Sequence, residues 1–113
     1  MDCIFCKIAR GEIPSQILHQ DDELTAFRDI RPQAPTHVQI IPKRHIETIL
    51  ELRESDERLI GKMVILANRL AQEEGIAENG YRLVFNCRSY GGQEVYHVHL
   101  HLLGGRRMTW PPG

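Results

Sequence analysis

The segment from Val95 to Leu103 is the strongest constraint on the fold, because histidines and aliphatic residues alternate along it. Successive side chains of a β-strand point to opposite faces, so this pattern predicts a strand with one imidazole face and one apolar face. The imidazole face carries His97, His99 and His101, and the apolar face carries Val98, Leu100 and Leu102. We expect the apolar face to anchor the strand in the core.

The three histidines are close enough along this strand to act on one ligand. Neighbouring imidazoles on one face are separated by the rise of two residues, about 6.6 Å, so they can converge on one small anion or metal ion. A single histidine in a strand is usually structural, whereas three in register indicate a site. Just upstream, Gly91 and Gly92 allow backbone amides to approach a ligand and form an anion-binding concavity, for which phosphate is the natural ligand.

Imidazole is a suitable nucleophile toward phosphorus near neutral pH. A useful fraction of it is uncharged, and one ring nitrogen can attack while the other is held as a hydrogen-bond donor. The remaining histidines, together with backbone amides, can stabilise charge on the phosphate oxygens. The pattern therefore predicts nucleophilic attack on phosphorus, but the spacing does not rank the three histidines.

Hydrophobic spacing and breaker residues predict the other elements. We expect a short helix over residues 1–9, a hairpin over 16–20 and 24–28, and a third strand over 36–41 that is stopped by Pro42. A long helix is expected from Ser55, as its N-cap, to Glu74, with Gly75 at its exit. Residues 81–86 form the fourth predicted strand. This order does not alternate as βαβ units do, so it predicts an α+β fold with a mainly antiparallel five-stranded sheet, one long helix and one short helix.

The composition suits a single domain over residues 1–113 that acts on small molecules. Hydrophobic residues make up 42% of the 113 residues, and the formal net charge is -1. This balance favours neither nucleic-acid binding nor attachment to a membrane. The first residues lack a cationic leader followed by an apolar run, so we expect a cytoplasmic location.

The histidine strand and several shorter motifs resemble the histidine triad superfamily of nucleotide hydrolases and transferases, and in particular its histidine triad nucleotide-binding branch. The resemblance covers nearly the whole chain. The shorter motifs are Asp29-Ile30, residues 33–37, Ile41-Pro42-Lys43, Tyr81-Arg82, Gly91-Gly92-Gln93, Gly104-Gly105-Arg106 and residues 110–113. The resemblance implies a HIT-like fold whose sheet extends across a homodimer.

The resemblance implies a purine nucleoside phosphoramidase activity, which cleaves the phosphorus–nitrogen bond of adenosine or guanosine 5′-phosphoramidates. Aminoacyl adenylates are a second substrate class that it implies. By the same analogy His99 is the nucleophile and forms a nucleotidyl-histidine intermediate that water hydrolyses. His37, His97 and His101 bind phosphate or steady their neighbours, and catalysis needs no cofactor.

Four residues near the phosphate are also implied by the resemblance. Asn86, Gln93 and the backbone amides after Gly92 are expected to contact the substrate. Glu94 occupies a position near the leaving group where animal members of the branch usually carry serine. A carboxylate there can move a proton but repels phosphate, so the protonation of the leaving amine stays open.

For the nucleoside, the resemblance implies that Asp29 holds the ribose hydroxyls and that three apolar residues line the base pocket. These residues are Ile13, Phe27 and Ile30. On sequence alone their residue types suit plain core packing equally well, and Asp29 is equally suited to an ordinary turn.

Residues 104–113 are implied to form a tail that reaches toward the partner of the homodimer. Trp110 followed by Pro111-Pro112 is an aromatic residue on an extended terminus, a pattern more often found at a packed end than in a site. Members of the family carry this residue to the partner's active site, so the dimer would contribute to catalysis.

Cys3 and Cys6 form a Cys-x-x-Cys pair, which favours thiols or metal ligands over a disulfide framework. Many members of the nucleotide-binding branch lack this pair. In related superfamily members, a histidine after the third strand and the first triad histidine complete a zinc site, and here these are His45 and His97. The resemblance thus implies a structural zinc. Two small buried cysteines and a surface His45 are the equally weighted alternative.

Three other functions remain open at this point. Another branch of the superfamily hydrolyses dinucleoside polyphosphates, although the chain's ending resembles the nucleotide-binding branch. A nucleotide-binding or interaction module that has lost catalysis is a second alternative. A metal-binding protein that uses the three strand histidines as ligands ranks last, because no carboxylate lies at a partnering spacing.

Overall fold

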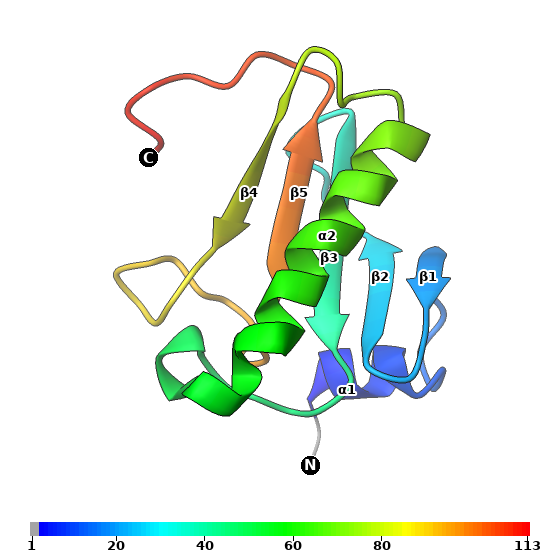
Figure 1. Cartoon of the computed structure of the whole chain (residues 1–113), viewed down its shortest axis with the longest axis vertical. Coiled ribbons are helices and arrows are strands. Elements are labelled where there is room, and N and C mark those ends of the chain that lie inside the picture. The colour runs from blue at the N-terminus through cyan, green and yellow to red at the C-terminus, as the bar shows by residue number, and fades with distance from the viewer. Residues whose placement is uncertain (1–2) are drawn as a thin grey trace.

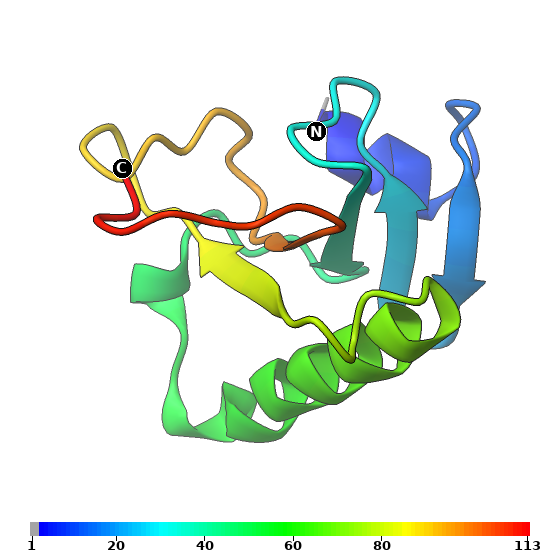
Figure 2. The ribbon, with the colours of Figure 1, turned by 90° about the horizontal axis from the view of Figure 1, so that it is seen from above.

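Residues 3–113 are described by the computed structural model, and they form a five-stranded sheet with α2 on one face and α1 on the other (Figures 1 and 2). Neighbouring strands are antiparallel, in the order β1-β2-β3-β5-β4. The predicted α+β fold is confirmed. The elements are α1 (Ile4–Ala9), β1 (Ile17–Gln20), β2 (Leu24–Arg28), β3 (Thr36–Pro42), α2 (Glu57–Glu73), β4 (Tyr81–Phe85) and β5 (Leu100–Gly104), with 3-10 turns at Ile49–Glu51 and Glu54–Asp56.

Two hydrophobic clusters sandwich the sheet. The larger one joins the apolar stripe of α2 to one face of the strands, and each buried leucine or isoleucine in it contributes about 1.5–3 kcal/mol to folding. Val98, Leu100 and Leu102 belong to this cluster, so the apolar side of the histidine segment is anchored as predicted. The smaller cluster, on the opposite face, comprises Phe5, Ile8, Ala9, Phe27 and Ile41. We refer to this opposite face as the histidine face.

The start of α2 differs from the prediction. Ser55 is not its N-cap, because it lies in the 3-10 turn and Asp56 occupies the cap position. Asp56 is buried, accepts the backbone N–H of Arg53 at 2.9 Å and pairs with Arg44, so the turn is closed before the helix begins. The predicted exit is confirmed, since Gly75 has φ 73°, in the region that glycine adopts without strain.

The histidine strand is shorter than predicted. β5 spans Leu100–Gly104 rather than Val95–Leu103, so two of the three histidines precede it. The ladder with β3 stops near Pro42, where β3 ends, because proline has no N–H group to continue it. Val98 N–H instead donates to Ile46 O at 2.7 Å, in the loop after β3. The chain is thus held by that loop where a strand was expected.

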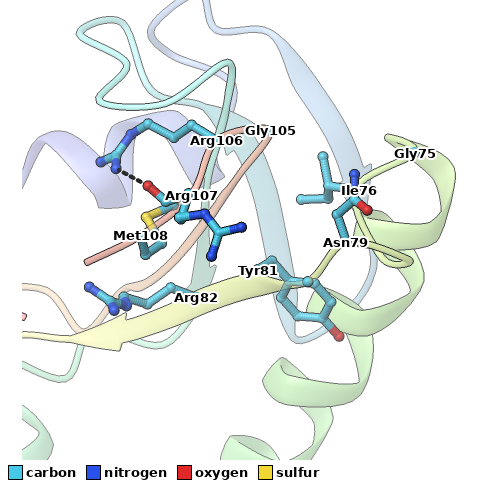
Figure 3. A pocket seen from close by; sticks show the side chains of 10 residues that line it. Gly75, Ile76, Asn79, Tyr81, Arg82, Gly105, Arg106, Arg107 and Met108 are labelled. Atoms are coloured by element: carbon cyan, nitrogen blue, oxygen red, sulfur yellow. Dashed lines mark hydrogen bonds between the residues drawn. The ribbon is translucent and has the colours of Figure 1, made fainter. Parts of the chain in front are cut away.

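A cavity of about 700 Å³ lies away from the histidines (Figure 3). It is bordered by the end of α2, the start of β4 and the beginning of the C-terminal tail, and Arg82, Arg106 and Arg107 are among its lining residues. The residues after Gly104 form neither helix nor strand, and both views place the C-terminus on the β4 side of the sheet (Figures 1 and 2).

Candidate active site

Strand register brings part of the site together. β3 and β5 are antiparallel, with Gln39 opposite His101 and His37 opposite Leu103. Side chains two residues apart on a strand share a face, so His37, Gln39 and His101 all lie on the histidine face. His99 follows on from this group, because its ring lies edge-on to that of His101 with the centroids 4.9 Å apart. We call His37, His99 and His101 the reactive row.

His99 is held with one ring nitrogen free. Its Nδ1 lies 2.7 Å from the carbonyl oxygen of His97, and because a carbonyl only accepts, Nδ1 carries the hydrogen. The Nε2 atom of the neutral ring therefore keeps its lone pair. Phe5 packs edge-on against the same ring at 5.1 Å between centroids, and only 7% of His99 is exposed. This is the arrangement that a nucleophilic imidazole requires.

A relay of hydrogen bonds sets the tautomers of the other two members of the row. The backbone N–H of Gln33 donates to His37 Nδ1 at 3.1 Å, so the hydrogen of His37 is on Nε2. His37 Nε2 then donates to His101 Nδ1 at 2.9 Å. A neutral His101 that accepts at Nδ1 carries its own hydrogen on Nε2. That N–H is available as a donor to a phosphate oxygen.

Burial keeps the row uncharged near neutral pH. It lowers the pKa of His37 and of His99 below the usual histidine value, since the charged form loses solvation. Burial, together with the neighbouring His99 and His37, lowers the pKa of His101 to about 4. The charges of Asp29 and Glu94 raise the pKa of His99 and so offset part of its decrease. All three rings are therefore neutral at pH 7.

Asp29 lies at the edge of the row with both carboxylate oxygens engaged. Oδ1 accepts the backbone N–H of Arg31 at 2.8 Å, and Oδ2 accepts Gln39 Nε2 at 2.6 Å. Oδ2 is also 3.4 Å from His37 Nε2. The position predicted for ribose binding is thus next to the row. The hydrogen bond from Arg31 N–H to Asp29 is also the turn contact that an aspartate at this position commonly makes.

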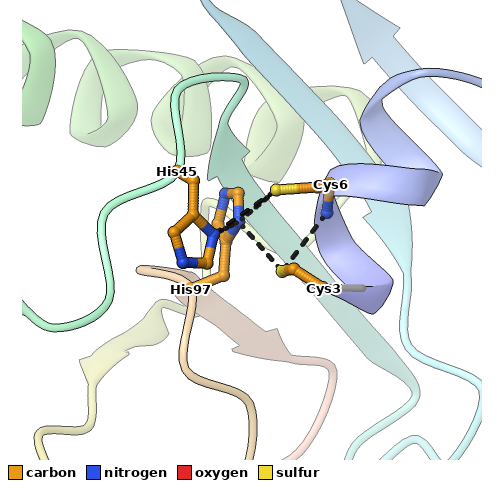
Figure 4. Close-up of side chains that lie close together, drawn as sticks. All are labelled: Cys3, Cys6, His45 and His97. Atoms are coloured by element: carbon orange, nitrogen blue, oxygen red, sulfur yellow. Dashed lines mark hydrogen bonds between the residues drawn. The ribbon is translucent and has the colours of Figure 1, made fainter. Parts of the chain in front are cut away.

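A second group, which we call the thiol-imidazole cluster, comprises Cys3, Cys6, His45 and His97 (Figure 4). The Sγ atoms of Cys3 and Cys6 lie 3.3 and 3.5 Å from His97 Nδ1. His45 Nδ1 lies 3.4 Å from Cys6 Sγ and 3.2 Å from His97 Nδ1. Cys6 lies in α1 and Cys3 is the N-cap of that helix, whereas His45 lies in the loop after β3 and His97 in the segment before β5. His97 is fully buried among them.

The geometry and chemistry of this cluster fit a tetrahedral metal ion. Bonds of about 2.3 Å to sulfur and about 2.0–2.1 Å to nitrogen give sulfur–nitrogen and nitrogen–nitrogen distances of about 3.3–3.6 Å, close to those observed. His97 Nε2 donates to Pro42 O at 2.7 Å, which leaves a lone pair on the inward-facing Nδ1. Burial and the nearby Cys3 sulfur raise the pKa of Cys6, so a cation is what would hold the Cys6 sulfur as a thiolate.

The glycine loop does not have the predicted role throughout. The N–H groups of Gly91, Gly92 and Gln93 donate to carbonyls of Arg88 and Ser89 within the loop, so they are not directed at a ligand. A Cβ atom on Gly91 would lie 2.5 Å from the carbonyl oxygen of Cys87, and glycine is needed there for internal packing. Gly92, with φ 78°, has open space beside it.

The Gln93 side chain braces the loop, and its expected substrate contact stays a prediction. It is buried, and its Oε1 accepts the backbone N–H of Arg88 at 2.8 Å. Its Nε2 donates to the carbonyl oxygens of Glu47 and Val95 at 2.8 and 3.0 Å. The carboxamide therefore ties the loop to the segment after β3.

The residues predicted for the base pocket differ in exposure. Phe27 is buried in the smaller cluster, and Ile13 packs at the edge of that cluster, so core packing accounts for Phe27. Ile30 is 90% exposed on the loop after β2, where core packing does not explain it. Trp110 is 81% exposed on the tail. The remaining predicted residues, Asn86 and Glu94, are half-buried and exposed, respectively.

Two residues of the site were not predicted from the sequence. Phe5 lies in the short helix predicted over residues 1–9, and its ring contacts both His97 and His99. Gln39 alternates with His37 on β3, so the period-2 pattern that located the histidine strand also places it on the histidine face.

Sequence and structure comparisons place the chain in a family. The family model described as HIT domain matches residues 10–108, and the chain belongs to this family. The purine nucleoside phosphoramidase of Escherichia coli K12 is 56% identical over 105 residues, which cover 93% of this chain and 88% of that protein. The crystal structure of a HIT family hydrolase from Legionella pneumophila superposes with a TM-score of 0.97 at 62% identity, covering 99% of this chain and 100% of the other.

These comparisons confirm the predicted superfamily and its fold. Cys3, Cys6 and Trp110 lie outside the range that the family model matches. Among residues 3–113, no helix is long and apolar enough to cross a membrane.

Proposed function

We propose that this protein is a purine nucleoside phosphoramidase, which hydrolyses the phosphorus–nitrogen bond of adenosine or guanosine 5′-phosphoramidates. The observation that carries the proposal is the state of His99, whose Nδ1–H is bound to His97 O and whose Nε2 is therefore unprotonated beside the His101 ring. The activity of the E. coli relative supports the same reaction. Aminoacyl adenylates are a second substrate class of the proposal.

In the first step His99 Nε2 attacks phosphorus, and a nitrogen–phosphorus bond to His99 forms. The substrate nitrogen gains a proton, takes the electron pair of the phosphorus–nitrogen bond and leaves as an amine. The His101 N–H stabilises charge on a phosphate oxygen, and His37 holds His101 in the donating tautomer. The carbonyl of His97 stabilises the positive charge that develops on the His99 ring.

In the second step water attacks the same phosphorus atom. His99 recovers the electron pair of its bond, a nucleoside 5′-monophosphate departs, and one proton is released. In this proposal Asp29 holds the ribose hydroxyls, and Asn86 contacts the substrate near the phosphate. Ile30, which is 90% exposed, is the proposed contact for the base, together with Ile13 and Phe27.

Mass spectrometry of protein quenched during turnover of adenosine 5′-phosphoramidate tests this proposal. We expect a nucleotidyl adduct on His99. A diadenosine polyphosphate run in parallel tests the dinucleoside alternative, and faster cleavage of that substrate would favour it. Tight binding of AMP with no cleavage of either substrate would favour a binding module instead.

The proposal includes a structural zinc ion held by Cys3, Cys6, His45 and His97. Four donors at tetrahedral spacing, and the lone pair that His97 directs toward the sulfurs, support it. Bound zinc would link α1 to the segment before β5, and no catalytic step is assigned to it. Metal analysis of the purified protein should give about one zinc per chain.

The proposal also includes a homodimer in which β4 pairs with β4 of a second copy. β4 is an edge strand, and its apolar residues Leu83 and Phe85 are only partly buried. An exposed apolar edge favours pairing with another strand. The tail, residues 104–113, would then carry Trp110 toward the partner's site. Light scattering should give twice the chain mass, and replacing Leu83 by lysine should lower it.

A further inference from the structure

Gln39 is a buried glutamine on the histidine face, two residues along β3 from His37. Only 8% of it is exposed. It pairs in register with Phe27 on β2 and with His101 on β5, so it lies between a residue proposed for the base and one proposed for the phosphate. A buried amide is normally retained with hydrogen-bond partners, because an unpaired polar group costs stability.

The amide nitrogen of Gln39 has a strong partner. Nε2 donates to Asp29 Oδ2 at 2.6 Å, while Arg31 N–H holds Oδ1 at 2.8 Å. Both carboxylate oxygens of Asp29 are thereby fixed. Each oxygen keeps a further lone pair, so the carboxylate offers two acceptors at a fixed separation. Two such acceptors match the two adjacent hydroxyl donors of a ribose.

The amide oxygen of Gln39, in contrast, is buried and has no hydrogen-bond partner among residues 3–113. An apolar side chain of similar size would avoid this cost, so stability does not explain a glutamine at this position. The hydrogen bond from Gln39 Nε2 to Asp29 explains why this position carries a glutamine.

We propose that Gln39 is a positioning residue that fixes Asp29 for the 2′ and 3′ hydroxyls of the nucleotide, and that it thereby makes the enzyme selective for ribonucleotides. This inference rests on the proposed function, and in particular on nucleotide binding beside Asp29. Gln39 itself need not touch the substrate. It acts by restricting Asp29 to the orientation in which both hydroxyls are accepted.

The test compares adenosine 5′-phosphoramidate with its 2′,3′-dideoxy counterpart in the wild type and in Gln39→Met. We expect KM for the ribose substrate to rise about tenfold, the equivalent of about one net hydrogen bond, with kcat nearly unchanged. The dideoxy substrate should be affected less than about twofold. The denaturation midpoint should stay the same or rise, because the unpaired oxygen is removed.

Gln20→Met is the matched control. Gln20 lies on β1, and its Nε2 donates to Ala9 O at 2.9 Å rather than to the site, so its loss should leave the substrate ratio unchanged. A second control combines Gln39→Met with Asp29→Ala. Because Gln39 acts through Asp29, the double variant should be no worse than Asp29→Ala alone. An unchanged substrate ratio in Gln39→Met, or an equal loss on both substrates, would overturn the inference.

Nuclear magnetic resonance of the wild-type protein gives a measurement that needs neither turnover nor a variant. The side-chain amide signals of Gln39 should shift when AMP is added and should not shift with 2′,3′-dideoxyadenosine monophosphate. Equal responses to both nucleotides contradict the inference. If the protein cleaves both substrates at equal rates, the inference about Gln39 is wrong but the proposed reaction stands. If AMP alone shifts the Gln39 signals and neither substrate is cleaved, the proposed reaction is wrong but the inference stands. Binding of neither nucleotide defeats both.

Discussion

His97 and His99 are two residues apart, and each donates a hydrogen bond to a backbone carbonyl, but they do so through opposite ring nitrogens. His97 uses Nε2, toward Pro42 O, and leaves Nδ1 facing two sulfurs. His99 uses Nδ1, toward His97 O, and leaves Nε2 free beside His101. The same residue type is thus the proposed metal ligand in one case and the proposed nucleophile in the other.

The difference shows that backbone carbonyls, and not the spacing of the histidines, set which ring nitrogen of each histidine keeps a lone pair. A carbonyl that accepts from one ring nitrogen fixes which other nitrogen carries the lone pair and where it points. The two regions are also linked, because His97 supplies its side chain to the thiol-imidazole cluster and its carbonyl to His99. Variants of the reactive row should therefore lose turnover, whereas variants of the thiol-imidazole cluster should lose metal and stability.

The largest expected effect is that of His99→Ala. Loss of the nucleophile should lower turnover of adenosine 5′-phosphoramidate on the order of 10⁴-fold or more, since no other group replaces it. Metal content should stay unchanged, because the cluster is intact. Steady-state kinetics and metal analysis of the same preparation measure both.

His19→Ala is the control for this variant, because His19 is a histidine on β1 that contacts Asp21 and Arg69 outside the site. Its turnover should remain close to that of the wild type. Full activity in His99→Ala would show that another residue attacks phosphorus.

The next largest effect is expected from Cys6→Ser, on the other side of the comparison. Removing one of four ligands should weaken zinc binding by more than the roughly 10–100-fold that loss of an outer partner costs. Stability should fall as well, because bound metal stabilises only the folded chain. Metal content per chain and the thermal unfolding midpoint are the measurements. Cys87→Ser should keep its metal, and equal metal content in both variants would remove the cluster from the proposal.

The strands, the helices and the imidazole face could be predicted from the sequence. The start of β5 could not, and this has a physical cause. Alternation located the imidazole face and its apolar anchor, and hydrophobic spacing with breaker residues located the five strands and two α-helices that residues 3–113 form. Alternation does not report where a ladder ends. β5 begins only at Leu100 because β3 stops at Pro42, so the chain before it follows loop contacts that no periodicity encodes.

Ring-nitrogen assignments also lie beyond the sequence. They depend on carbonyls at Pro42 and His97 that become partners only through tertiary structure. Similarly, Gly91-Gly92-Gln93 has the composition of an anion-binding loop, yet its N–H groups close the loop on itself. The same loop sequence permits both arrangements, and only the fold distinguishes them.

A smaller effect is expected from acid. The pKa of His101 is about 4 in the folded protein and about 6.5 in an unfolded chain, so between these values the unfolded state binds more protons. The contribution of His101 to the free energy of unfolding should therefore be fully present above about pH 6.5. It should be lost as the pH falls toward 4. After allowance for partial solvent exposure the contribution is about 1–3 kcal/mol.

The measurement for this prediction is urea denaturation at several pH values between 7 and 4, in the wild type and in His101→Asn. The variant lacks the titrating ring, so its stability should depend less on pH in this window, whatever its stability at pH 7. Parallel pH profiles for the two proteins would show that His101 is not the group responsible.

The smallest effect is expected from Phe5→Leu, which tests whether the two regions are mechanically connected. Phe5 is buried in α1 and its ring contacts both His97, at 6.0 Å between centroids, and His99, at 5.1 Å. Leucine keeps the site apolar but removes part of the ring surface, so we expect a loss of about 1 kcal/mol in stability. Turnover should fall a few-fold, because the His99 ring gains freedom, while metal content stays unchanged. If turnover is unaffected although stability falls, the carbonyl of His97 alone orients His99. If metal is lost together with turnover, α1 acts as one rigid unit that couples the cluster to the nucleophile.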